Sequence, residues 1–140
     1  MRPYLVLVGL AIAACSHHPT AVRLDDIRAQ RTMWNSQRPT DYTYDYEVDG
    51  FFISYAGQPL RLEVRADTVR SATFVASGRT LAGVSGLPTI DALFDQAEAA
   101  AKAGSLKAVT YDARYGFPTR MDLAGPPDAS GSVLASNLQP

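Results

Sequence analysis

Short segments in which apolar and polar residues alternate constrain the fold of this chain most strongly. Residues 41–48 read DYTYDYEV, so that tyrosine or valine occupies every second position. Residues 60–65 repeat the alternation, and a turn at 66–67 leads into a third segment at 68–76. Period-two alternation is typical of a strand with one buried face. Because the turns between these strands are short, we expect antiparallel pairing.

The alternation shifts by one position after Asp49-Gly50. A two-residue hairpin at this point would produce the shift and would place Tyr46 opposite Ile53. A single long strand with a bulge at Gly50 would produce it as well. A second turn signal at 56–59 favours the bulge, and both structures remain open.

Two segments have helical periodicity. The first comprises residues 21–34, with Thr20 as a candidate N-cap and an apolar stripe made by Leu24, Ile27 and Trp34. The second follows the candidate N-cap Thr89, ends near Gly104, and has an apolar stripe of Ile90, Leu93, Phe94, Ala97 and Ala101. We expect its outward face to carry Asp91, Asp95 and Glu98.

Three further segments with strand character follow at 105–111, 119–123 and 132–138. The expected order is therefore α-β-β-β-α-β-β-β, within one domain at 21–140. The chain of 140 residues has the usual size of a single domain. We expect an α+β fold in which an antiparallel sheet carries two helices packed on one face.

The first 14 residues have the composition of a signal peptide. Arg2 supplies a positive charge, and the eleven apolar residues at 4–14 are too few to cross about 30 Å of hydrocarbon. Residues 12–15, IAAC, resemble the lipobox of bacterial lipoproteins. The resemblance implies removal of residues 1–14 and attachment of diacylglycerol to Cys15. Two or more acyl chains, such as palmitate, would anchor the chain stably.

Cys15 and residues 16–20 would then form a short tether to the domain. Residues 16–20 reach roughly 17 Å when fully extended, which would hold the domain close to the membrane. Ser16 resembles the residue that directs lipoproteins to the outer membrane in bacteria with two membranes. We therefore expect a lipid-anchored, periplasm-facing protein of the cell envelope.

Residue types that carry catalysis are scarce in the expected domain. The only histidines, His17 and His18, lie in the tether, and Cys15 is the only cysteine. Triads and Cys-His pairs would therefore lack a base in the domain, and zinc sites with several thiolates are excluded. A formal net charge of −1 indicates no basic field for nucleic acid. We expect no enzymatic activity, cofactor or metal.

Three functions compete on this basis. The leading hypothesis is a non-enzymatic binding or accessory domain that contacts another envelope protein. The second is a small-ligand site on a sheet face that presents Tyr42, Tyr44, Tyr46 and Tyr55. The third is a hydrolase that uses paired carboxylates, for which the candidates are Asp91 with Asp95 and Asp45 with Glu47.

Residues 111–119, YDARYGFPT, form the most specific motif of the domain. They resemble the Y-D-x-x-x-G-[YF]-P-T signature of an uncharacterised bacterial family, domain of unknown function 6174, which is often found on lipoproteins. The resemblance spans about 21–138 and implies a fold and an envelope location, but no activity. The motif residues, to which we assign a structural role in a hairpin corner, are Trp34, Tyr111, Asp112, Gly116, Phe117, Pro118 and Thr119.

The chain departs from the family pattern at two places. Many members have a cysteine pair where this chain has residues 50–52. Many also have acidic residues after the Pro-Thr strand, where only Asp122 and Asp128 remain. If those acids bind a cation in relatives, we expect that this chain does not.

Overall fold

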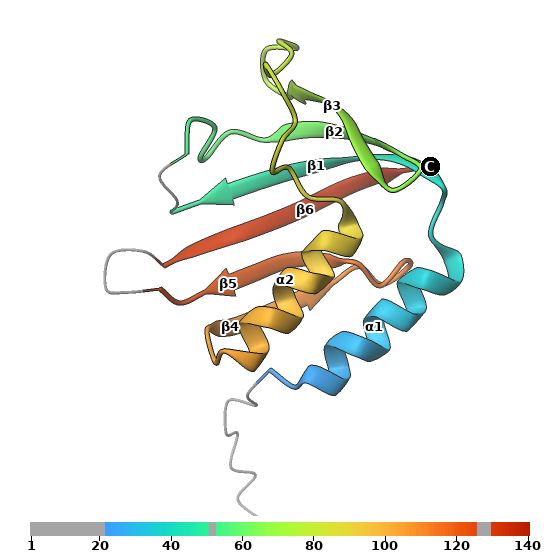
Figure 1. Cartoon of the computed structure of the whole chain (residues 1–140), viewed down its shortest axis with the longest axis vertical. Helices are drawn as coiled ribbons and strands as arrows, with labels where there is room; N and C mark the ends of the chain where they lie inside the picture. Colours follow the sequence, from blue (N-terminus) through green and yellow to red (C-terminus); the bar gives the residue numbers. More distant parts are fainter. Residues whose placement is uncertain (1–21, 51–52, 126–129) are drawn as a thin grey trace, which may run out of the picture.

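The computed structural model describes residues 22–50, 53–125 and 130–140. Its elements are α1 (Leu24–Gln37), β1 (Asp41–Asp49), β2 (Leu60–Arg65), β3 (Thr68–Phe74), α2 (Ile90–Lys102), β4 (Leu106–Tyr111), β5 (Pro118–Leu123) and β6 (Gly131–Gln139). The strands form one open antiparallel sheet in the order β3-β2-β1-β6-β5-β4. Figure 1 shows both helices on the same side of the sheet. The expected α+β fold and its element order are confirmed, whereas the expected signal peptide, Cys15 and tether lie outside the described residues.

β1 lies in the middle of the sheet, where it pairs with both β2 and β6. Its alternate side chains Tyr42, Tyr44 and Tyr46 are buried, as the period-two pattern predicted. They belong to one core cluster with apolar side chains of both helices. Trp34 of α1 is fully buried in this core and meets Tyr42 edge to face, with ring centroids 5.6 Å apart. The sheet face that the helices cover is therefore the apolar face of the alternation.

A longer loop joins β1 to β2, so both structures expected at Asp49-Gly50 are wrong. Leu60 is the first residue of β2 and pairs with Tyr46, which therefore does not face Ile53. Residues 53–57 form turns whose backbone groups bond locally, as in the 3.1 Å hydrogen bond from the Ala56 N–H to the Ile53 carbonyl. The alternation of apolar and polar residues therefore shifts within a loop. The alternation by itself cannot distinguish such a loop from a bulge.

α1 begins and ends about three residues later than the sequence predicted. The residue before its first turn is Arg23, which supplies no capping hydrogen bond from its side chain, and Thr20 lies outside the described residues. The helix continues past Trp34 to Gln37, and the Arg38 N–H still donates to the Trp34 carbonyl at 2.8 Å. No helix in the part of the chain described is long and apolar enough to span a bilayer.

α2 begins as predicted, because the Thr89 hydroxyl accepts a hydrogen bond from the Ala92 N–H at 3.2 Å. The expectation that its three acids all face outward is wrong for two of them. Glu98 accepts a hydrogen bond from Arg31 of α1 at 3.1 Å, and Asp91 accepts one from the Trp34 ring nitrogen at 3.3 Å. The reason is that α1 lies along the polar side of α2, which the periodicity of α2 does not reveal.

Candidate functional site

The residues of the 111–119 motif form a tight corner between β4 and β5. The Asp112 carboxylate accepts hydrogen bonds from the backbone N–H groups of Arg114, at 2.9 Å, and Tyr115, at 2.6 Å. Its backbone N–H donates to the Phe117 carbonyl at 2.9 Å, and its carbonyl accepts from Gly116 at 3.0 Å. These four bonds involve the whole turn. Asp112 therefore has a local structural task that accounts for its place in the motif.

The corner packs against α1. Gly116 has a φ of +79°, and a Cβ atom built on it would lie 3.0 Å from the Gln30 carbonyl oxygen of α1. Phe117 is 2 % exposed and meets Trp34 edge to face, with ring centroids 6.2 Å apart. Burial raises the pKa of the Tyr111 hydroxyl to about 12. The structure thus brings most of the expected motif residues together around the end of α1.

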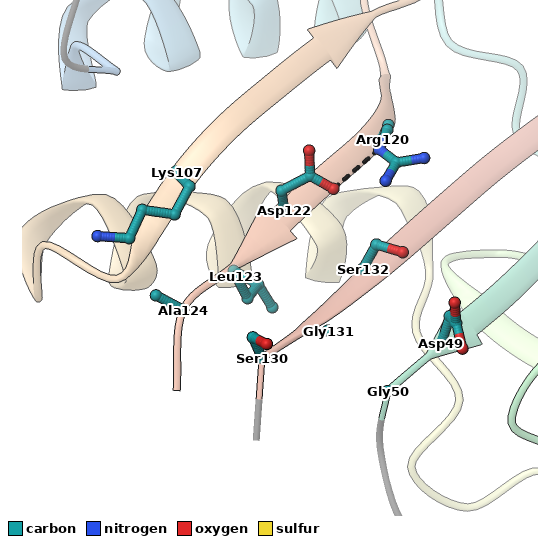
Figure 2. Close-up of a pocket in the computed structure, with 10 residues that line it drawn as sticks. All are labelled: Asp49, Gly50, Lys107, Arg120, Asp122, Leu123, Ala124, Ser130, Gly131 and Ser132. Carbon is teal, nitrogen blue, oxygen red and sulfur yellow. Dashed lines mark hydrogen bonds and ion pairs between the residues drawn. The ribbon is translucent and has the colours of Figure 1, made fainter. Parts of the chain in front are cut away.

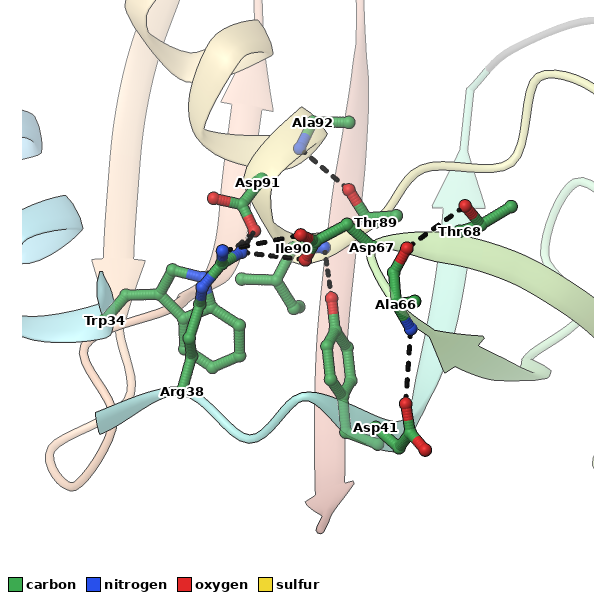
Figure 3. A network of polar contacts seen from close by, with 11 residues as sticks. Trp34, Arg38, Asp41, Ala66, Asp67, Thr68, Thr89, Ile90, Asp91 and Ala92 are labelled. Atoms are coloured by element: carbon green, nitrogen blue, oxygen red, sulfur yellow. Dashed lines mark hydrogen bonds and ion pairs between the residues drawn. The ribbon is translucent and has the colours of Figure 1, made fainter. Parts of the chain in front are cut away.

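Arg38 connects three elements in a polar network that the sequence did not predict (Figure 3). Its guanidinium donates to Asp91 of α2 at 2.6 Å and to Asp67 of the β2–β3 turn at 2.9 Å. Trp34 donates to the same oxygen of Asp91. Both carboxylates are bound to one guanidinium, so they hold α1, α2 and the hairpin together and do not form a free acid–base pair. Partners this far apart in the chain leave no local sequence signal.

Among the charged side chains of the described residues, that of Asp45 is buried, with 7 % of its surface exposed. It lies on the sheet face opposite the helices, where Arg61 donates to its two oxygens at 2.7 and 2.9 Å. Asn137, in a bulge of β6, donates a third hydrogen bond at 2.7 Å. Burial raises the pKa of the Asp45 carboxyl, but these hydrogen bonds outweigh it and hold the pKa below its ordinary value. Asp45 is thus held as the acceptor of these hydrogen bonds, which does not favour its proposed role as a catalytic acid beside Glu47.

The side chains of the β1 tyrosines are buried and are not presented on an open sheet face. Tyr44 is fully buried, and its hydroxyl donates to the Pro88 carbonyl. The Tyr42 hydroxyl accepts a hydrogen bond from the backbone N–H of Ile90, the first residue of α2. Burial raises the pKa of both Tyr42 and Tyr46 to about 12. These rings fill the core, which counts against the hypothesis of a ligand on a tyrosine-rich face.

A polar hollow of about 480 Å³ lies at one end of the sheet (Figure 2). Two basic side chains, Lys107 and Arg120, and two acidic ones, Asp49 and Asp122, line it. Arg120 and Asp122 bond to each other at 2.8 Å. Among the described residues, no group of three or more histidine, cysteine or acidic side chains could hold a metal ion.

Two loops form a nearly uncharged surface, which we call the loop pole and define as residues 53–59 and 75–88. The large hydrophobic side chains that are exposed in the described part of the chain both lie here, Ile53 at 39 % and Val75 at 47 %. The single charged residue of the loop pole is Arg79. The loops meet at a hollow of about 400 Å³, lined by Ser54, Phe74, Arg79, Thr80, Leu81 and Ala82. Periodicity did not predict this surface, because it arises where two loops lie side by side.

Comparison with known proteins gives one match. A model described as a family of unknown function (DUF6174) matches residues 26–137, from the first turn of α1 into β6. Neither a curated protein nor a solved structure matches the chain. The match therefore concerns the whole folded domain and carries no chemistry.

Proposed function

The chain belongs to the family of unknown function DUF6174, and we propose that it is a lipid-anchored envelope protein whose domain binds another envelope protein. The binding surface in this proposal is the loop pole. The domain has no enzymatic role in it and needs no cofactor. Acyl chains on Cys15 would hold it to the membrane, in the outer membrane where the organism has two.

The observation that carries the proposal is the position of the exposed apolar side chains. Ile53 and Val75 both belong to the loop pole, and Val75 also borders the adjoining hollow that Asp45 and Glu47 line. Exposed apolar side chains that gather on one surface are typical of sites for protein partners. A small-ligand site would instead be an enclosed apolar pocket with a few converging polar groups.

The arrangement of the domain relative to its tether supports the same function. Figure 1 shows the start of α1 near one end of the molecule and the loop between β3 and α2 at the other. A tether before α1 would therefore place the loop pole on the side away from the anchoring leaflet. A partner that projects from the membrane could reach it there.

The carboxylates of the described domain support a non-enzymatic role. Asp67 and Asp91 share the guanidinium of Arg38, and Asp45 accepts three hydrogen bonds. Acid–base catalysis by carboxylates needs one that an apolar pocket keeps protonated near neutral pH. The pKa of Asp45 is shifted in the opposite direction.

Substitution of Cys15 tests the anchor. We expect the wild-type protein in the membrane fraction, with a mature mass that includes acyl chains and lacks residues 1–14. Cys15→Ser should be released from membranes or remain as an uncleaved precursor. A wild-type protein that fractionates as soluble, with no added acyl mass, would contradict the lipid anchor.

Photo-cross-linking tests the binding surface. A benzoylphenylalanine residue at Val75 of the full chain, expressed in its own cells, should give a discrete adduct with another envelope protein that mass spectrometry identifies. The same residue at Ser36, which is exposed on α1, is the matched control and should give much less of this adduct. Equal yields at the two positions, or no protein adduct at Val75, would refute binding through the loop pole.

A further inference from the structure

We infer that the partner presents a carboxylate to Arg79, from a segment whose neighbouring side chains are apolar. This inference rests on the proposed function and names the chemistry of its partner. Arg79 lies within the hollow between the two loops of the loop pole. Ile53 and Val75 are the chain neighbours of Ser54 and Phe74, which line that hollow as well.

Arg79 is held in place by Phe74. Its guanidinium carbon lies 4.9 Å from the centroid of the Phe74 ring, as in a cation–π contact. Its backbone carbonyl accepts a hydrogen bond from the Phe74 N–H at 2.9 Å. Phe74 is itself buried, at 7 % exposure, so it provides a fixed base for the exposed arginine. Less side-chain entropy is then lost when Arg79 binds a partner.

Arg79, like Arg70 and Arg114, has no ion-pair partner among the described residues, whereas Arg61 and Arg120 on the open sheet face do. Arg61 and Arg120 each bond to a carboxylate on their own or the adjacent strand. By contrast, no carboxylate of the described residues lies within 4.0 Å of the Arg79 guanidinium. The loop pole contains no aspartate or glutamate. In the inferred complex, the partner would supply the complementary negative charge.

A carboxylate is the anion that this setting favours. The planar guanidinium can donate two parallel hydrogen bonds to it, and stacking on Phe74 leaves the edge of the guanidinium available. Leu81 and Ala82, which line the same hollow, are apolar. When an apolar partner segment covers them, water leaves the hollow and the ion pair becomes stronger.

Charge reversal at Arg79 tests the inference in the cross-linking assay. In the full chain with benzoylphenylalanine at Val75, we expect Arg79→Glu to lower the yield of the protein adduct at least about tenfold, as for a close interfacial charge pair. Arg70→Glu is the matched control, because Arg70 is exposed as Arg79 is but lies on β3, outside the loop pole. It should change the yield less than twofold. Mass spectrometry should place the cross-linked partner residue within a few residues of an aspartate, a glutamate or the chain terminus.

A second substitution separates a lost charge pair from a damaged fold. Changing the identified partner acid to lysine should restore the adduct with Arg79→Glu and reduce it with Arg79. The inference is refuted if the adduct forms but does not respond to charge at Arg79, or if its partner segment lacks a carboxylate. An adduct with lipid would also refute it. So would an adduct with a second copy of this chain in which no carboxylate lies near the cross-linked residue. Absence of any protein adduct at Val75 would instead refute the proposed function itself.

Discussion

The corner at 111–119 and the loop pole both turn the chain through glycines with positive φ, but their surroundings differ. At the corner, a Cβ atom on Gly116 would lie 3.0 Å from the Gln30 carbonyl oxygen and 3.1 Å from the Met33 Cβ. At the loop pole, Gly78 has a similar φ of +68°, yet its Cβ would meet no atom within 4 Å. A glycine with positive φ is therefore packed closely against α1 at the corner, whereas a glycine of similar φ lies at an open surface at the loop pole.

The burial of side chains also differs between the corner and the loop pole. Aromatic rings from β1 and the corner surround Trp34 of α1, which makes edge contacts with Tyr42, Tyr115 and Phe117. At the loop pole, Ile53 and Val75 are the exposed hydrophobic side chains of the described residues. The comparison indicates that the corner contributes more to stability than the exposed side chains Ile53 and Val75 of the loop pole, which can change at little cost to the fold.

The largest expected effect follows from Trp34→Ala at the corner. Removing a fully buried indole should lower the free energy of unfolding by about 3–5 kcal/mol, because the cavity loses both burial and aromatic contacts. Urea denaturation, followed by circular dichroism, measures this change. A loss below about 1 kcal/mol would mean that the corner is not where stability is concentrated.

A matched pair of glycine substitutions sharpens the comparison. Gly78→Val should cost about 1–3 kcal/mol, because a β-branched residue is strained at positive φ. Gly116→Val should cost more by at least about 1 kcal/mol, because its side chain also collides with α1. The difference between the two urea denaturation curves is the test. Equal losses would show that α1 moves away from the corner without cost.

The smallest expected effect is that of Val75→Ser at the loop pole. Because Val75 is 47 % exposed, the free energy of unfolding should change by no more than about 0.5 kcal/mol. Urea denaturation under the same conditions checks this value. A loss above about 1 kcal/mol would show that the exposed valine stabilises the fold, and would remove the contrast between the two regions.

The features that the sequence predicted correctly depend on interactions between residues that are close in the chain. Period-two alternation predicted the buried tyrosines of β1, because successive strand side chains point to opposite faces. Thr89 was predicted to cap α2 because its hydroxyl only has to reach a backbone group three residues away. Gly116, which the motif placed in a hairpin corner, has a positive φ as such a turn requires. Each of these features depends on a few neighbouring residues.

Tertiary structure alone decided the features that depend on distant partners. The pairing of β1 with β6 makes β1 central, and no local pattern indicates it because the two strands are far apart in the chain. Asp91 faces α1 only because the helices lie side by side. The segment between β1 and β2 is a loop, because Tyr46 of β1 pairs with Leu60, the first residue of β2. The loop pole exists because two loops meet and place Arg79 over Phe74. Sequence periodicity describes one element at a time, whereas these contacts arise from the packing of elements against each other.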